Sequence, residues 1–190
     1  MEGKIQKINS TTYESVLGKG KVEFGDKNNS EFIPSCKLSA FNDECFLKVT
    51  LTQESATPQE ESPGNISRVR GSFLNDSQRD VEFYSLEPTE QYEHGGFEFE
   101  VILKEKPESN IVEFDIEVNG LNFYYQPEIT DEEAQLLADE ENISLFEAKR
   151  LIRPENVVGS YAVYHAIKKN GKYKTGKAFH IYRPKIIDDN

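Results

Sequence analysis

Residues 171–177, with the sequence GKYKTGK, match the spacing G-x-x-x-x-G-K of loops that bind phosphate. Such a loop wraps its backbone amides around the phosphate, sends its lysine to it, and lies between a buried strand and a helix. Here Ala178 stands where Ser or Thr is required, and Phe179-His180-Ile181 alternates like a strand. We therefore predict a hairpin turn whose lysines lie on a solvated sheet edge, not a phosphate site.

The histidines and cysteines do not have the spacing of a zinc site. The histidines are His94, His165 and His180, and neither Cys36 nor Cys45 belongs to a C-x-x-C pair. The two cysteines lie near a predicted strand turn, where they could face each other across a hairpin. Because the first residues contain no hydrophobic export signal, we predict reduced, buried thiols, with a cross-hairpin disulfide as the alternative.

Two of the histidines fall on opposite strands of a predicted hairpin. If Asn170-Gly171 is a two-residue loop, His165 pairs with Gly176 and His180 pairs with Tyr161. The simpler explanation for histidines at these positions is that an aromatic ring covers a glycine on the paired strand. Catalysis and metal binding are the alternatives.

The acidic clusters also lack the pattern of a catalytic or metal site. Neither residues 131–133 nor residues 139–141 form an alternating-oxygen loop with a central glycine, as calcium requires. Favourable charge at a helix N-terminus explains the first cluster, and a solvated helix face explains the second. There is no G-x-S-x-G elbow, and no pair of carboxylates stands out among thirty-four. We therefore expect no catalytic, cofactor or metal site and no enzyme activity.

Alternating apolar residues indicate a chain built mainly of strands. The period of two is typical of half-buried sheets, and Gly, Asn and Pro mark the turns between them. Asn119-Gly120 predicts a type I′ hairpin that joins the last strands of a three-stranded meander. The predicted strands are 21–24, one that begins at 32, 37–41, 46–51, 81–84, 97–103, 111–118, 121–125, 157–165 and 178–182.

Between two of these strands the period changes from two to 3.6. Thr130-Asp131-Glu132-Glu133 and Ser144-Leu145-Phe146-Glu147 are both capping boxes, in which a hydroxyl and a glutamate satisfy each other's backbone amides. Pro154 must end the second helix. The sequence therefore predicts a helical hairpin at 130–153, set into the sheets as an insertion.

Length and composition favour one domain over residues 1–190. The hydrophobic content of 36%, with twelve Phe and nine Tyr, is enough for a sizeable core. Residues 53–67 are rich in Ser, Glu, Pro and Gly and predict an exposed flexible loop. The predicted fold is mainly β, an antiparallel β-sandwich or jelly-roll-like fold with the inserted hairpin.

Charge is distributed unevenly along an acidic chain. The net charge of −12 argues against nucleic acid or an anionic membrane as the main partner, and no apolar run is long enough to cross a bilayer. Residues 107–148 hold twelve Asp/Glu and no Lys or Arg, whereas residues 149–190 hold ten Lys/Arg and three Asp/Glu. These segments could contact each other between neighbouring copies or, in the interpretation that we favour, within one molecule.

Tyrosines and lysines gather in the last predicted hairpin. An exposed tyrosine can stack on a sugar ring or anchor a protein interface, because it offers a large area at low entropic cost. The alternative is that half of these tyrosines belong to the core and the rest cover the sheet edge. The candidate interaction residues are Tyr161, Tyr164, Tyr173, Tyr182, Lys172, Lys174 and Lys177.

Three segments resemble an uncharacterised family of hypothetical β-rich proteins from phage genomes and bacterial metagenomes. They are GGFEFEVILKEKP at 95–107, RPENVVGSYAVYH at 153–165 and YKTGKAFHIYRPKIID at 173–188. The resemblance implies a non-enzymatic virion-associated structural protein, such as a capsid decoration or tail component. Its partners would be other subunits of a particle or of a homo-oligomer, and it would reach the virion from the host cytoplasm during assembly. A carbohydrate-binding or adhesion module is the first alternative, and a hydrolase with dispersed carboxylates is the second.

Overall fold

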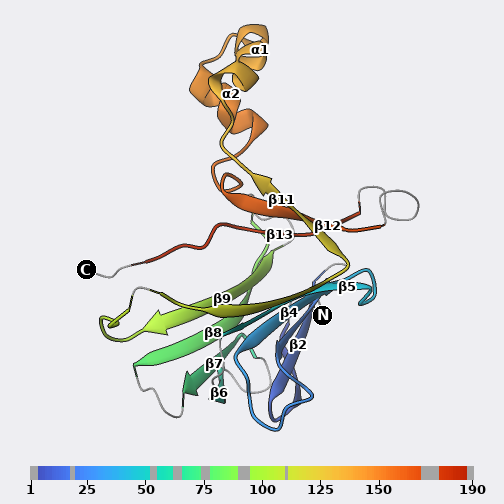
Figure 1. The fold of residues 1–190 in the computed structure, drawn as a ribbon, viewed down its shortest axis with the longest axis vertical. Coiled ribbons are helices and arrows are strands. Elements are labelled where there is room, and N and C mark those ends of the chain that lie inside the picture. The colour runs from blue at the N-terminus through green and yellow to red at the C-terminus, as the bar shows by residue number, and fades with distance from the viewer. Residues whose placement is uncertain are drawn as a thin grey trace. The chain divides into compact units, whose positions relative to one another are not determined.

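The chain folds mainly as antiparallel sheets, as the sequence predicts. The computed structural model describes residues 4–17, 20–51, 55–61, 66–73, 78–89, 95–109, 111–167 and 176–187. Strands account for 51% and helices for 12% of it, in three antiparallel sheets and one pair of helices (Figure 1). The chain divides into two compact units, residues 1–120 and residues 121–190.

The first unit contains a six-stranded sheet and a four-stranded sheet. The larger sheet has the order β1-β2-β3-β4-β5-β10, and every pair in it is antiparallel. Consecutive strands are neighbours except at β10, which returns to β5 after the whole of the smaller sheet. Its strands are β1 (Gln6–Asn9), β2 (Thr12–Leu17), β3 (Gly20–Gly25), β4 (Ser35–Ala40), β5 (Cys45–Leu51) and β10 (Phe114–Asn119).

The smaller sheet includes part of the segment that was predicted to be a loop. Its strands, in the order of the sheet, are β6 (Ala56–Glu61), β7 (Arg68–Phe73), β8 (Arg79–Leu86) and β9 (Gly96–Leu103). The prediction of a flexible loop over 53–67 is therefore wrong for residues 56–61. Pro58 argued against a strand, because proline lacks the backbone N–H that a central strand needs. β6 is an edge strand, however, and an edge strand can accommodate a proline.

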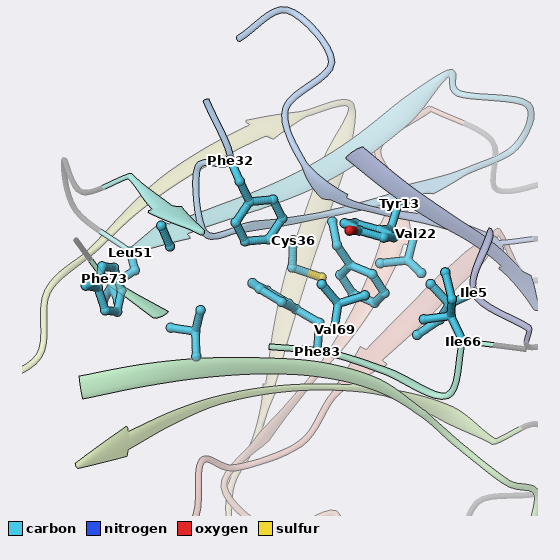
Figure 2. Close-up of a cluster of buried hydrophobic side chains, with 13 residues drawn as sticks. Ile5, Tyr13, Val22, Phe32, Cys36, Leu51, Ile66, Val69, Phe73 and Phe83 are labelled. Atoms are coloured by element: carbon cyan, nitrogen blue, oxygen red, sulfur yellow. The ribbon is translucent and has the colours of Figure 1, made fainter. Parts of the chain in front are cut away.

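The two sheets of the first unit pack face to face around an aromatic core (Figure 2). Phe83 of the smaller sheet lies between Phe24 of the larger sheet and Phe99 of its own, with ring centroids 5.0 and 4.5 Å away. The ring of Phe32 covers Gly71, where an added Cβ would lie only 2.8 Å from a methyl group of Val81. The other buried members are Ile5, Tyr13, Val22, Cys36, Leu51, Ala56, Ile66, Val69 and Phe73.

Both cysteines are buried thiols of this unit and form no disulfide with each other, which agrees with the predicted reduced state. They do not face each other, since Cys36 pairs with Val49 and Cys45 pairs with Ala40. Burial raises the pKa of the Cys36 thiol to about 12. The reactive thiolate is therefore almost absent at neutral pH.

We expect thiol reagents at pH 8 to label the folded chain far more slowly than the chain unfolded in urea. Thiolate is needed for attack, and a pKa near 12 leaves about one Cys36 in ten thousand ionised at that pH. Labelling kinetics followed by absorbance, with and without denaturant, measure the difference. Equal rates in the two conditions would contradict the buried position of Cys36.

The hairpin predicted at Asn119-Gly120 is absent from the structure. β10 pairs with β5, whereas β11 (Leu121–Gln126) pairs with β12 (Ser160–His165). A type I′ turn needs a positive φ at both central residues, and of these two only Gly120 has one, at 63°. The predicted meander of three consecutive strands is therefore wrong.

The second unit combines a three-stranded sheet, β11-β12-β13, with two helices. β13 spans Lys177–Ile181, and the helices α1 (Asp131–Glu141) and α2 (Leu145–Ile152) lie between β11 and β12. Both predicted capping boxes are present, at Thr130 with Glu133 and at Ser144 with Glu147. The helices pack through small side chains, among them the buried Ala134, Ala138 and Ala148.

Candidate interaction surface

The pairing of β11 with β12 places three aromatic residues side by side on one face of the sheet. Phe123 pairs with Val163 and Tyr125 pairs with Tyr161, and directly paired residues of antiparallel strands point to the same face. Phe123, Tyr125 and Tyr161 are 38%, 56% and 41% exposed. We call these three residues the aromatic cluster.

The rings of the aromatic cluster contact one another. Tyr161 lies at the centre, with its ring centroid 5.4 Å from that of Tyr125 and 6.5 Å from that of Phe123. These mutual contacts restrict the rotamers, so that a partner would meet partly ordered rings at a small entropic cost. The cluster therefore offers apolar area together with two hydroxyl groups, which suits either a protein partner or a sugar ring.

The opposite face of the same sheet carries a second group of aromatic side chains. The rings of Tyr124 and Tyr164 meet edge to face at 5.4 Å, and those of His180 and Tyr182 lie 4.6 Å apart. Tyr164 is half-buried, whereas Tyr124 is 45% exposed. Tyr164 on this face is therefore less exposed than the three residues of the aromatic cluster.

Ser160 and His180 on this second face form a hydrogen bond that resembles a nucleophile with its base. The hydroxyl oxygen lies 2.6 Å from Nε2 of His180, but the Ser160 hydroxyl donates its proton to the carbonyl of Val157. Nε2 must then donate to the hydroxyl, which is the opposite of the polarity that activates a serine. Burial, followed by the nearby charge of Lys177, lowers the pKa of His180. The bond therefore ties β12 to β13 and does not activate Ser160.

The register of this hairpin matches the prediction at one end only. The amide of His165 donates to the carbonyl of Gly176, as predicted. Beyond an irregularity between Val163 and Tyr164 the register moves by one residue, so that His180 pairs with Ala162 and not with Tyr161. A bulge of this kind cannot be deduced from loop length, which was the only basis of the prediction.

The candidate interaction residues that the structure describes lie at different places in the three-stranded sheet. Tyr161 belongs to the aromatic cluster, Tyr164 points to the opposite face, and Tyr182 follows the end of β13. Lys177 is exposed at the start of β13. Tyr173, Lys172 and Lys174 lie outside the described residues, as do His94 and most of the G-x-x-x-x-G-K segment.

Phe123 and Tyr125 were missed as candidates. The run Phe123-Tyr124-Tyr125 could have predicted them. Three consecutive aromatic residues in one strand must point to both faces of the sheet. The same alternation explains why Tyr124 meets Tyr164 and not Tyr161.

A charged cluster lies on the outward face of the smaller sheet of the first unit. Glu82 is almost fully buried and accepts hydrogen bonds from the guanidinium groups of Arg68 and Arg70. Glu100, its neighbour on β9, accepts a bond of 2.5 Å from the hydroxyl of Tyr84. Glu82 and Glu100 are a pair of neighbouring acids of the kind that the alternative of a hydrolase would need, but each carboxylate accepts hydrogen bonds from donors of the same sheet.

The residues that the structure describes hold neither a metal-ligand cluster nor a membrane-spanning helix. No three His, Cys, Asp or Glu side chains come together there as metal ligands, and neither helix is long and apolar enough to cross a membrane. Comparison with protein-family models, curated proteins and solved structures gives no match.

Proposed function

We propose that this chain is a non-enzymatic structural protein that binds other proteins through the aromatic cluster. The observation that carries the proposal is the mutual contact of Phe123, Tyr125 and Tyr161, which remain 38–56% exposed on one sheet face. Tyrosine and phenylalanine are enriched where proteins meet, because each ring buries a large area and loses little entropy.

A virion is the specific setting that we propose, as a capsid decoration or tail component. Support comes from the resemblance of residues 95–107, 153–165 and 173–188 to β-rich proteins of phage genomes. A β-sandwich-like unit with a separate aromatic surface also fits a subunit that docks onto a larger particle. Fold alone would not justify this step, since sandwiches serve many functions.

We expect the double change Tyr125→Ala and Tyr161→Ala to reduce binding of the chain to purified phage particles at least tenfold. Two interfacial tyrosines commonly contribute more than 1 kcal/mol each, and about 1.4 kcal/mol is a factor of ten. Co-sedimentation of the purified chain with particles, followed by electron microscopy of labelled chain, measures the effect.

Phe146→Ala provides the matched control, because this ring of α2 is 66% exposed and lies outside the aromatic cluster. It should bind as the unchanged chain does, and all three proteins should unfold at similar temperatures. Equal particle binding by the double variant, or no binding by the unchanged chain, would refute the proposal.

A carbohydrate-binding module is the alternative that one observation favours. Tyr125 and Tyr161 are adjacent and exposed, with their ring planes at 52°, so that each could stack on a sugar ring. A glycan array separates the two functions. Saturable sugar binding that disappears in the double tyrosine variant, without particle binding, would favour the alternative.

A further inference from the structure

The edge strands of the first unit differ in how they are protected against pairing with another chain. An edge strand presents unpaired backbone groups, and natural sheets protect them with prolines, bulges or inward-pointing charges. β6 contains Pro58, and β1 has an irregular register and turns Lys7 towards the core side, where its ammonium group binds Glu60. β10 has none of these features, because it pairs with β5 in a regular register from end to end. Of these three edges, β10 is therefore the one that another strand can reach most easily.

The core-facing side of β10 is apolar but incompletely covered. Phe114, Ile116 and Val118 point to this side and are 40%, 64% and 46% exposed. The residue of β5 that pairs with Phe114 is Leu51, and it is only 2% exposed. The ring of Phe114 lies 5.7 Å from that of Phe99 on β9, so the core reaches as far as β10. One further strand with apolar side chains on its inner face would therefore complete the core at this edge.

The outer face of β10 is acidic. Asp115 and Glu117 point to this face, and Glu117 pairs with Lys48 of β5. The ammonium group of Lys48 lies 2.7 Å from a carboxylate oxygen of Asp26 and 3.7 Å from one of Glu117, so a single lysine serves both acids. An added strand would place its outward residues opposite Asp115 and Glu117, where a basic residue stabilises the pairing and an acidic residue opposes it. This charge disfavours the β10 strand of a second copy as the occupant.

The smaller sheet already contains a strand pair with the chemistry that β10 requires. Its strand β8 resembles β10, with the apolar Phe83 on the core side and the acidic Glu82 on the outer side. The neighbouring strand β7 carries Val69 towards the core and turns Arg68 and Arg70 outwards, where both guanidinium groups bind Glu82. Alternation of apolar and basic residues is therefore how this chain itself pairs a strand of this kind.

We propose that β10 binds an extended segment of another protein, in which apolar residues alternate with arginine or lysine, as an additional strand of the six-stranded sheet. Backbone hydrogen bonds along the edge supply affinity, and the alternating side chains supply specificity. The apolar residues cover Phe114, Ile116 and Val118, and the basic residues face Asp115 and Glu117. This site uses the first unit alone and is separate from the aromatic cluster of the second unit.

Two labelled peptides test the proposal by fluorescence anisotropy. One alternates arginine with valine, and the other carries glutamate in place of each arginine. We expect the unchanged chain to bind the basic peptide roughly tenfold more tightly than the acidic one. The variant Asp115→Lys/Glu117→Lys should reverse this preference, and a reversed preference cannot result from unfolding. Glu31→Lys/Glu140→Lys makes the same change in net charge at exposed sites outside β10, and should keep the preference of the unchanged chain.

Two further measurements separate strand addition from binding by charge alone. The basic peptide N-methylated at every residue keeps its side chains but has no backbone donor, so it should lose binding. Ile116→Thr keeps a β-branched residue in the strand but reduces its apolar surface, and should weaken binding of the basic peptide roughly threefold. The double tyrosine variant of the aromatic cluster should bind the peptide as the unchanged chain does.

Several results would overturn the proposal. The unchanged chain could bind neither peptide, or the Glu31→Lys/Glu140→Lys variant could change its preference as the β10 variant does. Equal binding of the N-methylated peptide would show that no strand is added. Loss of peptide binding in the folded double tyrosine variant would assign the peptide to the aromatic cluster. Self-association of the unchanged chain that Ile116→Thr abolishes would assign the edge to a second copy.

Discussion

Replacing Phe83 by alanine should lower the free energy of unfolding by about 3–5 kcal/mol, the usual range for a fully buried phenylalanine. Phe83 has no exposed surface and contacts Phe24, Phe32 and Phe99. The lost ring removes transfer free energy and also leaves a cavity, which its aromatic neighbours can fill only in part. Urea unfolding followed by circular dichroism and tyrosine fluorescence measures the change.

Phe146→Ala is again the matched control, because its ring is largely exposed on α2. It should change the free energy of unfolding by no more than about 0.5 kcal/mol. If both changes had similar effects, Phe83 would not occupy the centre of the core. The comparison depends only on burial, since the two substitutions remove the same atoms.

Strands that alternate clearly could be predicted from the sequence. β3, β5, β8 and β9 carry apolar residues at every second position, because one face packs on the core and the other carries polar side chains. β2 and β7 were missed. Ser15 of β2 and Gly71 of β7 interrupt the core-facing side of their strands, so the period of two is hidden although Tyr13 and Val69 are fully buried.

The pairing of distant strands could not be read from the sequence. β10 alternates as predicted, yet it pairs with β5, which lies more than sixty residues earlier. A local pattern such as Asn119-Gly120 indicates which turn the backbone favours. It does not indicate which strand will pair with the strand before the turn.

The candidate surface was predicted in part. Tyr161 was among the candidate interaction residues and is exposed, whereas Phe123 and Tyr125 were predicted only as strand residues. Whether an aromatic residue of a strand is buried depends on what covers its face of the sheet, and that layer is set by tertiary structure. Val163 illustrates the point, because it shares the face of Phe123 and is fully buried.

The second large effect concerns the charged cluster around Glu82. The double change Arg68→Ala/Arg70→Ala should lower the free energy of unfolding by roughly 3 kcal/mol, because it leaves a buried carboxylate without its partners. Glu82 is 1% exposed, whereas both arginines reach solvent. Urea unfolding at neutral pH measures the loss.

Glu82→Leu is the informative comparison, since it removes the buried charge together with the need for its partners. The two arginines can then turn towards water, and we expect less than half the loss of the double arginine variant. The triple variant Arg68→Ala/Arg70→Ala/Glu82→Leu should recover much of the stability lost in the double variant. If it were instead less stable than the double variant by the full cost of Glu82→Leu, the three residues would act independently, and the coupling inferred from their hydrogen bonds would be wrong.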